Sequence, residues 1–541
     1  MSSRALTILT VCSLLIPCGC ANITRWCNNG FKVGPEYGRP VFPVSESWID
    51  SQNEQIRQEQ PDHHNWWTVF NDPVLDQLIH TAYQQNLTLR VAGLRVLEAR
   101  RQQAITSANL LPQSQTFSAS YLRNQVSKTT ATATPLIPRA FDDVKTGFDL
   151  SWELDVWGRL RRAIEAADAS VEALVEDYDD ILVTLIGDVA ATYIEIRTFD
   201  ERLALAKQNI QIQQGSLRLT SVRNQEGKVS ELDVQEAVSN LADTRALVPS
   251  LEQGRRQAVN RMALLFGMRP SELDPVLATR GVLPTLPDHV VVGIPADLLR
   301  RRPDVRSAER VVAIQSAEIG IAEADLYPQF LLNGEIAWNS RRLSNLSSSA
   351  SNSGFITPGF TWKILNYGRL KNAIAIEELQ FQQQVLNYEN TVLQAHQEVE
   401  DAIVEFLQTQ KRAEQLEISA MAAEKTVDIV RTQYKEGATD FGRVFVLEGS
   451  LVQRQDQLIV AKAQIAIALT RAYKALGGGW QIRYEVPYRG RGSLDGLPTP
   501  VATEDSTEPE WNVDTDKDAA LPVLPPPELS DDSGRKPVPD E

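Results

Sequence analysis

Two long proline-free segments place the strongest constraint on this chain. No proline occurs for 110 residues between Pro138 and Pro249, or for 128 residues between Pro358 and Pro487. Because proline is the commonest helix breaker, both segments permit very long helices. Apolar residues recur there at alternating intervals of four and three, at Leu160, Ile164, Ala167, Val171, Leu174, Tyr178, Ile181 and Leu185, and again at Phe381, Val385, Tyr388, Val392, Ala395, Val399, Ala402 and Phe406. This 3.5-residue period predicts helices that supercoil around neighbours.

Glycines interrupt both helical patterns near their ends. From Arg159 to about Glu226 a continuous helix would reach roughly 100 Å, at ~1.5 Å per residue. Gly227 and Gly437 follow the two long helices, and a second apolar-periodic segment comes after each glycine. Since glycine is the usual residue just past a helix end, we expect two helical hairpins with tips near residues 227 and 437.

The chain is a tandem duplication. Asn109-Leu-Leu-Pro-Gln recurs as Asp325-Leu-Tyr-Pro-Gln. Trp152 followed by Gly158-Arg-Leu recurs 210 residues later as Trp362 followed by Gly368-Arg-Leu. The shared order and the nearly constant offset indicate a repeat of about 200 residues, far longer than a solenoid unit.

Each copy carries a pair of segments that alternate with period two. We expect strands near residues 113–123 and 146–155 in the first copy, and near 329–338 and 355–365 in the second. The face predicted to contact lipid comprises Phe148, Leu150, Trp152, Leu154, Phe360, Trp362 and Ile364. A soluble sheet with one wet face would also alternate, but strands of about ten residues with an apolar, aromatic-bearing face are typical of outer-membrane barrels. Four strands cannot close a barrel, so several chains would have to build one.

The N-terminus has the features of an export signal. Arg4, an apolar run from Leu6 to Pro17 and a small residue before Cys20 predict a signal peptide over residues 1–19. Gly19-Cys20 resembles a lipobox, which predicts a covalent lipid on Cys20; ordinary cleavage with unmodified cysteines is the alternative. All four cysteines lie in the first 27 residues, so no disulfide can link the rest of the chain.

Charge and motifs exclude several function classes. The net charge of −16 argues against a nucleic-acid partner. We find no pattern typical of a catalytic site, a metal site or a cofactor. Asp179 and Asp180 are interpreted as solvated charges. Residues 490–541 contain thirteen acidic and four basic side chains, and we expect disorder after Trp480.

Several segments together resemble the TolC family of outer-membrane channels, specifically the outer-membrane lipoproteins (NodT/OprM type) of resistance-nodulation-division efflux systems. The resemblance rests on Lys32-Val-Gly-Pro-Glu-Tyr37, Trp66-Trp67 with Asp72-Pro73, Leu299-Arg-Arg-Arg-Pro-Asp-Val305 and Gly477-Gly-Gly-Trp480. It implies a mainly α chain with a small β part. Three chains would form a 12-stranded β-barrel in the outer membrane, continued into the periplasm by an α-helical barrel. A periplasmic adaptor protein and an inner-membrane transporter of the resistance-nodulation-division type are the implied partners.

The resemblance also implies a gate at the periplasmic helix tips. Tyr434 is similar to the gate tyrosine of the family, and Asp233 to its hydrogen-bond partner; a packed tyrosine and an exposed carboxylate are the alternative. Alignment on Gly437 puts Val446, with Glu448 two residues later and Arg443 nearby, at the possible constriction. An apolar ring at this point could gate by dewetting.

The resulting prediction is a passive exit duct of a tripartite efflux pump. The port of a type I protein-secretion system is an alternative of the same architecture, and a periplasmic coiled-coil scaffold or adaptor is one of another class. The expected organisation is a signal peptide (1–19), a lipidated extension (20–65), a first repeat (66–275), a linker (276–300), a second repeat (301–480) and an acidic tail (481–541).

Overall fold

A computed structural model describes residues 26–485, except 44, 46, 58–63, 126, 128–139, 272, 274–280, 286, 288–289, 293–294 and 296–300. The chain divides into two units, residues 1–497 and 498–541, and every described residue lies in the first. The signal peptide, Cys20, most of the linker and the tail beyond Glu485 therefore lie outside the described residues.

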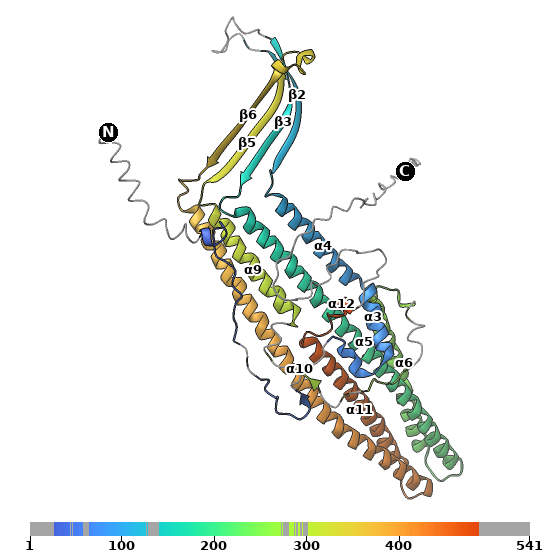
Figure 1. Cartoon of the computed structure of the whole chain (residues 1–541). Helices are drawn as coiled ribbons and strands as arrows, with labels where there is room; N and C mark the ends of the chain where they lie inside the picture. The colour runs from blue at the N-terminus through green and yellow to red at the C-terminus, as the bar shows by residue number, and fades with distance from the viewer. Residues whose placement is uncertain are drawn as a thin grey trace, which may run out of the picture. The chain divides into compact units, whose positions relative to one another are not determined.

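Four strands form one antiparallel sheet in the order β2-β3-β5-β6 (Figure 1). The strands are β2 (Ser114–Gln125), β3 (Ala140–Leu154), β5 (Gln329–Ser340) and β6 (Asn352–Thr361). The two copies meet where β3 pairs with β5, from Val144↔Ser340 to Leu154↔Phe330. Strand β6 ends at Thr361, four residues before the expected boundary.

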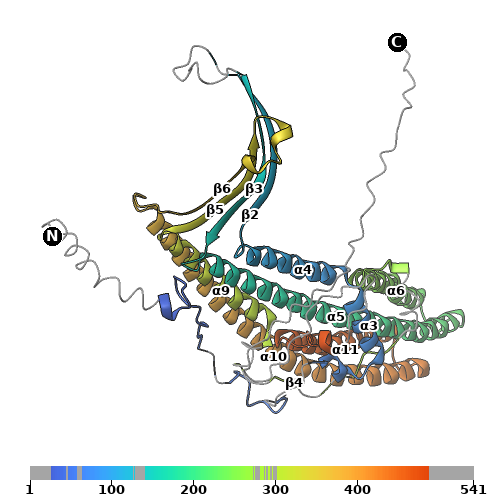
Figure 2. The same ribbon diagram turned by 45° about the horizontal axis from the view of Figure 1, so that its top comes forward.

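The helices that adjoin the strands all lie at one end of the sheet (Figures 1 and 2). The helices of the first copy are α3 (Pro73–Gln85), α4 (Leu87–Ala108), α5 (Arg159–Gln225) and α6 (Glu231–Leu265). Those of the second are α9 (Pro303–Ala324), α10 (Arg369–Glu436) and α11 (Phe441–Ala475). The 67-residue α5 and the 68-residue α10 confirm the two long helices. The helix α6 continues through Pro249.

The predicted heptad seam fits α10 better than α5. From Tyr388 to Phe406 the predicted α10 positions are buried, whereas on α5 only Leu160, Tyr178 and Leu185 are. The reason is that α5 packs against α4, α9, α6 and α11, so that burial spreads around the helix instead of following one stripe.

An apolar core joins the two copies. It gathers residues of α3, α5, α6, α10 and α11 around Trp66, Trp67 and Phe70, all almost fully buried. The chain enters this core through the short helix η1 (Trp66–Phe70) and a parallel pair of two-residue strands, β1 (Ile56–Arg57) and β4 (Val290–Val291).

The prediction of disorder after Trp480 is wrong for the residues that follow it directly. They form the short helix α12 (Ile482–Glu485), and Ile482 is fully buried in the core. The Arg483 guanidinium lies over the Trp480 and Tyr484 rings, which provides the packing that this segment would otherwise lack.

Candidate channel surfaces: sheet, junction and hairpin tips

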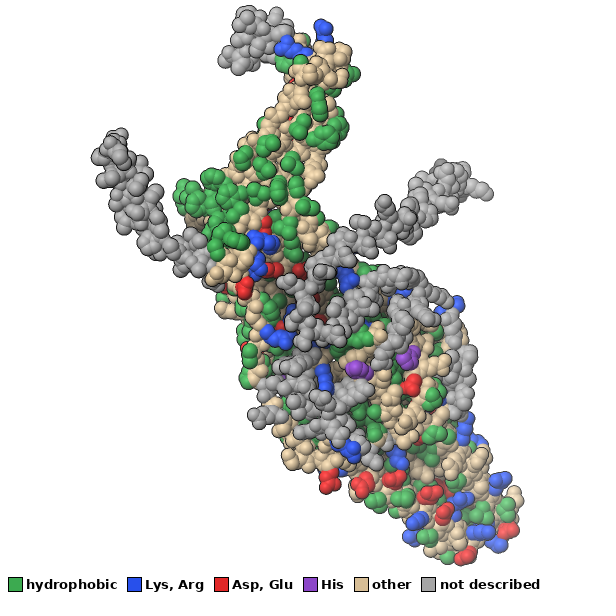
Figure 3. All heavy atoms as spheres, in the orientation of Figure 1, with side chains coloured by type: hydrophobic (Ala, Val, Ile, Leu, Met, Phe, Trp, Pro, Cys, Tyr) green, Lys and Arg blue, Asp and Glu red, His purple; other side chains and the backbone are tan. Residues whose placement is uncertain are grey.

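One face of the sheet is apolar across all four strands. The cross-strand register places Phe117, Phe148 and Ile336 in one row, and Trp152 beside Leu332 in another. The face comprises Phe117, Tyr121, Phe148, Leu150, Trp152, Leu154, Phe330, Leu332, Ile336, Ile356 and Phe360. Figure 3 shows hydrophobic side chains along the sheet, whereas charged side chains gather at the hairpin tips.

The opposite face of the same strands is mainly polar, although it also carries Leu122, Leu331 and Phe355. It presents small polar side chains on β2, such as Thr116 and Ser118, and the Lys145–Glu335 ion pair, whose Nζ and Oε2 atoms are 2.7 Å apart. A sheet with one apolar and one polar face suits a wall between hydrocarbon and water.

Two of the residues predicted for the lipid-contacting strand face lie beyond the strand. Trp362 and Ile364 follow the end of β6, and both are exposed. Trp362 Nε1 donates to the Leu326 carbonyl at 2.9 Å, and its counterpart Trp152 Nε1 donates to the Leu110 carbonyl at 3.0 Å. The two tryptophans therefore brace equivalent helix-to-strand turns in the two copies.

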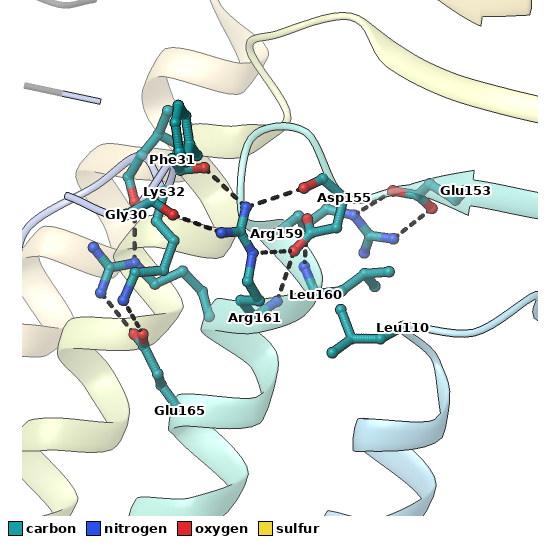
Figure 4. Close-up of polar contacts among 12 residues, drawn as sticks. Gly30, Phe31, Lys32, Leu110, Glu153, Asp155, Arg159, Leu160, Arg161 and Glu165 are labelled. Atoms are coloured by element: carbon teal, nitrogen blue, oxygen red, sulfur yellow. Dashed lines mark hydrogen bonds and ion pairs between the residues drawn. The ribbon is translucent and has the colours of Figure 1, made fainter. Parts of the chain in front are cut away.

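The turn from β3 into α5 is held by charged pairs (Figure 4). Arg159 makes a bidentate contact with Glu153, at 2.9 Å from Nε and 2.6 Å from Nη2. Asp155 accepts from the Leu160 amide at 3.0 Å and from Arg161 Nε at 3.0 Å. These contacts satisfy helix N-terminal donors and fix the angle between sheet and helix.

The N-terminal segment, residues 26–34, closes over this turn. Arg161 donates to the Gly30 carbonyl at 2.6 Å and to the Phe31 carbonyl at 2.9 Å (Figure 4). The Val33 amide donates to the Trp157 carbonyl at 3.0 Å. The segment is thus attached directly to the point where sheet and helix meet.

Trp157 joins this segment to the second copy. Its ring lies 5.3 Å from the Trp26 ring and 4.7 Å from the Tyr327 ring. Its Nε1 donates to the Pro328 carbonyl at 2.8 Å.

The matching turn of the second copy is open. Tyr367, the counterpart of Trp157 at the 210-residue offset, is 91% exposed. Arg369 Nε donates only over 3.4 Å, to the Asn366 carbonyl. The two copies therefore share a fold but not the cover over this turn.

The hairpin tips form where the glycines predict them. Gly227 and Gly437 adopt φ of +73° and +81°, the left-handed region that favours glycine. Ser230 and Asp233 form a capping box at the start of α6, and Asp440 caps α11 by accepting from the Arg443 amide at 2.9 Å.

The predicted hydrogen bond between Tyr434 and Asp233 is wrong for this structure. The Tyr434 hydroxyl donates to Thr220 Oγ1 at 3.3 Å, and the ring is only 2% exposed. Asp233 instead accepts from the Ser230 amide at 3.0 Å, because capping its own helix satisfies an otherwise unpaired donor. Tyr434 lies under the Arg223 guanidinium, 4.9 Å from its ring centroid, so it does belong to the contact between the hairpins.

The three residues predicted for the constriction do not share one surface. Arg443 and Val446 are exposed on α11, and Val446 keeps 63% of its surface free. The prediction that Glu448 lies at the constriction is wrong, since its side chain is 2% exposed and held between the two hairpins. Two residues further along a helix means a rotation of about 200°, which turns Glu448 to the opposite side from Val446.

Asp179 and Asp180 also differ from their interpretation as solvated charges. Asp179 is fully buried on α5. The Nη2 atom of Arg483 lies 3.0 Å from its Oδ2 in an ion pair that lacks hydrogen-bond geometry. Burial raises the pKa of Asp179 to about 8 and that of Asp180 to about 6.

Within the described part of the chain, no three His, Cys, Asp or Glu side chains gather as metal ligands would. None of the described helices combines the length and the hydropathy that crossing a bilayer requires.

Known proteins resemble this chain over most of its length. A family model described as "Outer membrane efflux protein" matches residues 78–268 and 294–478. Nodulation protein T of Rhizobium leguminosarum bv. trifolii is 29% identical over 465 residues, which cover 84% of this chain and 95% of that protein. The pyoverdine export outer membrane protein OpmQ of Pseudomonas putida is 30% identical over 423 residues, covering 77% and 88%.

A solved structure agrees with the family model and with these two relatives. The outer-membrane channel OprN is 31% identical and superposes with a TM-score of 0.77, covering 83% of this chain and 99% of that chain. The family matches span more than half of the sequence and fall one in each copy of the repeat. The chain therefore belongs to the outer membrane efflux protein family, with the mainly helical fold of TolC-like channels.

Proposed function

We propose that three copies of this chain form the passive exit duct of a tripartite efflux pump. The supporting observation is an open sheet with two free edges: among the described residues, β2 and β6 pair on one side only. Each edge would pair with the opposite edge of a neighbouring copy, a head-to-tail contact that closes as a ring. Three copies of four strands would make a 12-stranded barrel.

Exposed apolar stripes on the helices below the two edges support the same ring. The stripe on α4 comprises Leu87, Val91, Leu94 and Ile105, and that on α10 comprises Ile376, Leu379, Leu386 and Leu393. Most of their members recur at intervals of three, four or seven, as coiled-coil contacts do. We infer that α10 of one copy packs against α4 of the next.

The apolar sheet face would contact hydrocarbon, and the polar face would line the water-filled duct. A lipid on Cys20 would add a membrane anchor near the base of the sheet. Only five residues separate Cys20 from Trp26, which packs on Trp157 there. The helices would then extend into the periplasm.

The partners in this proposal are a periplasmic adaptor and an inner-membrane transporter of the resistance-nodulation-division type. The duct itself would supply no energy and no catalysis. Relatives carry names such as pyoverdine export protein and cation efflux system protein CusC. We propose small molecules as the cargo, released through a gate at the hairpin tips that includes Tyr434.

Membrane fractionation of the full-length protein tests this proposal. We expect a heat-modifiable trimer in the outer membrane, and Cys20→Ala should lose lipid labelling while Cys27→Ala keeps it. Expression beside its cognate pump should restore resistance to a host that lacks its own outer-membrane channel. A monomer in the soluble periplasmic fraction would contradict the duct and favour the scaffold.

A further inference from the structure

The buried line of α5 is mainly apolar as far as Ala206, and every buried residue after Ala206 is polar. Above this point the buried side chains include Leu182, Ile186, Val189 and Ile196, and the last apolar ones are Leu203 and Ala206. Toward the tip, the buried positions of α5 are Asn209, Gln213, Ser216 and Thr220. Their spacing of four, three and four continues the seam, so polar groups occupy positions where a coiled coil normally buries apolar ones.

Polar contacts join the two hairpins at every seventh residue of α5, starting at Arg202, just above Leu203, and ending at Arg223 near the tip. Arg202 contacts Asp456 of α11 at 2.6 Å and 3.0 Å, through Nε and Nη2. Asn209 Nδ2 donates to Gln455 Oε1 at 3.2 Å.

The same series continues toward the tip. Ser216 Oγ donates to Glu448 Oε1 at 2.6 Å. Arg223 Nη1 donates to the Tyr434 carbonyl. We call residues 202, 209, 216 and 223 with these partners the polar ladder.

Glu448 is the centre of the ladder because it contacts all the other helices of the two hairpins. Besides Ser216 of α5, its Oε2 accepts from Asn240 Nδ2 of α6 at 3.3 Å, and Arg431 Nε of α10 lies 3.7 Å from its Oε1. Desolvation raises the pKa of the Glu448 carboxyl, so the buried carboxylate depends on these donors.

We propose that Glu448 is the latch that holds hairpin α10–α11 against hairpin α5–α6, and that the two hairpins separate below Ala206 when the duct opens. The inference rests on the proposed function. It adds that Glu448 stabilises the closed state and that the separation of the hairpins stops at Ala206. Opening the seam above Ala206 would expose the large apolar core to water. Opening the part below Ala206 exchanges protein hydrogen bonds for hydrogen bonds to water and exposes only the smaller apolar cluster around Tyr434 and Phe441. Separation is therefore favoured below Ala206, and the Arg202–Asp456 contact stays closed.

Gln213 has the opposite effect to Glu448, because it destabilises the closed state. Its side chain is 2% exposed, and neither its Nε2 nor its Oε1 has a hydrogen-bond partner among the described residues. An unpaired buried amide weakens the closed seam, and it regains hydrogen bonds to water when the seam opens. Removing it should favour the closed state, whereas removing the Glu448 charge should favour the open one.

The test is the open probability of full-length trimers in a planar lipid bilayer. Glu448→Gln keeps the shape but loses the charge-assisted hydrogen bonds, and we expect the open probability to rise on the order of tenfold. Gln213→Leu should lower it. Glu417→Gln is the matched control, since Glu417 pairs at 2.9 Å with Lys462 at the exposed surface of one hairpin; it should behave as the wild type.

Heat-modifiable migration on gels identifies variants that still assemble. If Glu448→Gln does not assemble, Ser216→Ala removes the 2.6 Å hydrogen bond to the same carboxylate and should raise the open probability in its place. Wild-type open probability in Glu448→Gln, or in Ser216→Ala where it replaces that variant, would overturn the latch, as would an increase in Gln213→Leu. A wild-type trimer that conducts no ions under any condition would instead count against the proposed duct itself.

Discussion

At the residue scale, Gly34 permits the closest contact between the N-terminal segment and the helices. Its φ is +86°, and a Cβ at this position would lie 2.4 Å from the Gly320 Cα of α9. We expect Gly34→Ala to destabilise the fold by roughly 3 kcal/mol, from left-handed strain and the backbone clash together. The matched control is Gly38→Ala, because a Cβ on Gly38 would meet nothing within 4 Å. Thermal unfolding followed by circular dichroism measures the difference, and equal melting temperatures would contradict the clash.

Asp179 makes stability depend on pH. Its folded pKa of about 8 lies above the ordinary value of 3.8, so the folded chain holds the proton more tightly than the unfolded chain. The stability that protonated Asp179 contributes to the folded state is fully present below about pH 4 and is lost as the pH rises toward 8. We expect Asp179→Asn to lose less of its melting temperature than the wild type between these limits. Asp428→Asn, at an exposed site on α10, is the control, and its melting temperature should change with pH as that of the wild type does. The same change with pH in Asp179→Asn would exclude Asp179 as the source of the pH dependence.

At the element scale, the two copies of the strand-to-helix turn differ in what covers them. Arg161 holds residues 26–34 through the Gly30 and Phe31 carbonyls, whereas the corresponding Lys371 is exposed. Arg161→Met should release the segment and speed tryptic cleavage after Lys32 about tenfold, since two hydrogen bonds to a charged group are lost. Lys371→Met should leave that cleavage rate unchanged. Equal rates in both variants would mean that other contacts, such as Trp26 on Trp157, suffice to hold the segment.

At the scale of the whole molecule, a single chain leaves several apolar surfaces exposed, and the stripe on α10 is one of them. Leu386 lies in the middle of this stripe. Leu386→Glu should shift the proposed trimer toward monomer, because an unpaired carboxylate buried at a contact costs roughly 3 kcal/mol or more. Leu386→Met keeps the apolar area and should remain trimeric. Light scattering on detergent-solubilised protein gives the mass of both variants, and a fully trimeric Leu386→Glu would place the contact elsewhere.

The sequence alone determined the parts of this protein that depend on local pattern. The repeat follows from motifs that recur in the same order about 210 residues apart. The two long helices, the tips at Gly227 and Gly437 and the alternating strands follow from proline-free segments, from periods of 3.5 and 2 and from glycine geometry. Those periods report which face of an element is apolar, and this property needs no knowledge of the neighbour.

The tertiary structure alone decided which polar side chains are buried and what they contact. Glu448 was expected at a constriction and Asp179 in solvent, yet each contacts a partner more than two hundred residues away in the chain. Tyr434 likewise meets Thr220 instead of Asp233. A carboxylate on a helix has the same local signal whether water or another helix faces it. Only the packing of distant parts of the chain on one another supplies the partners that make its burial possible.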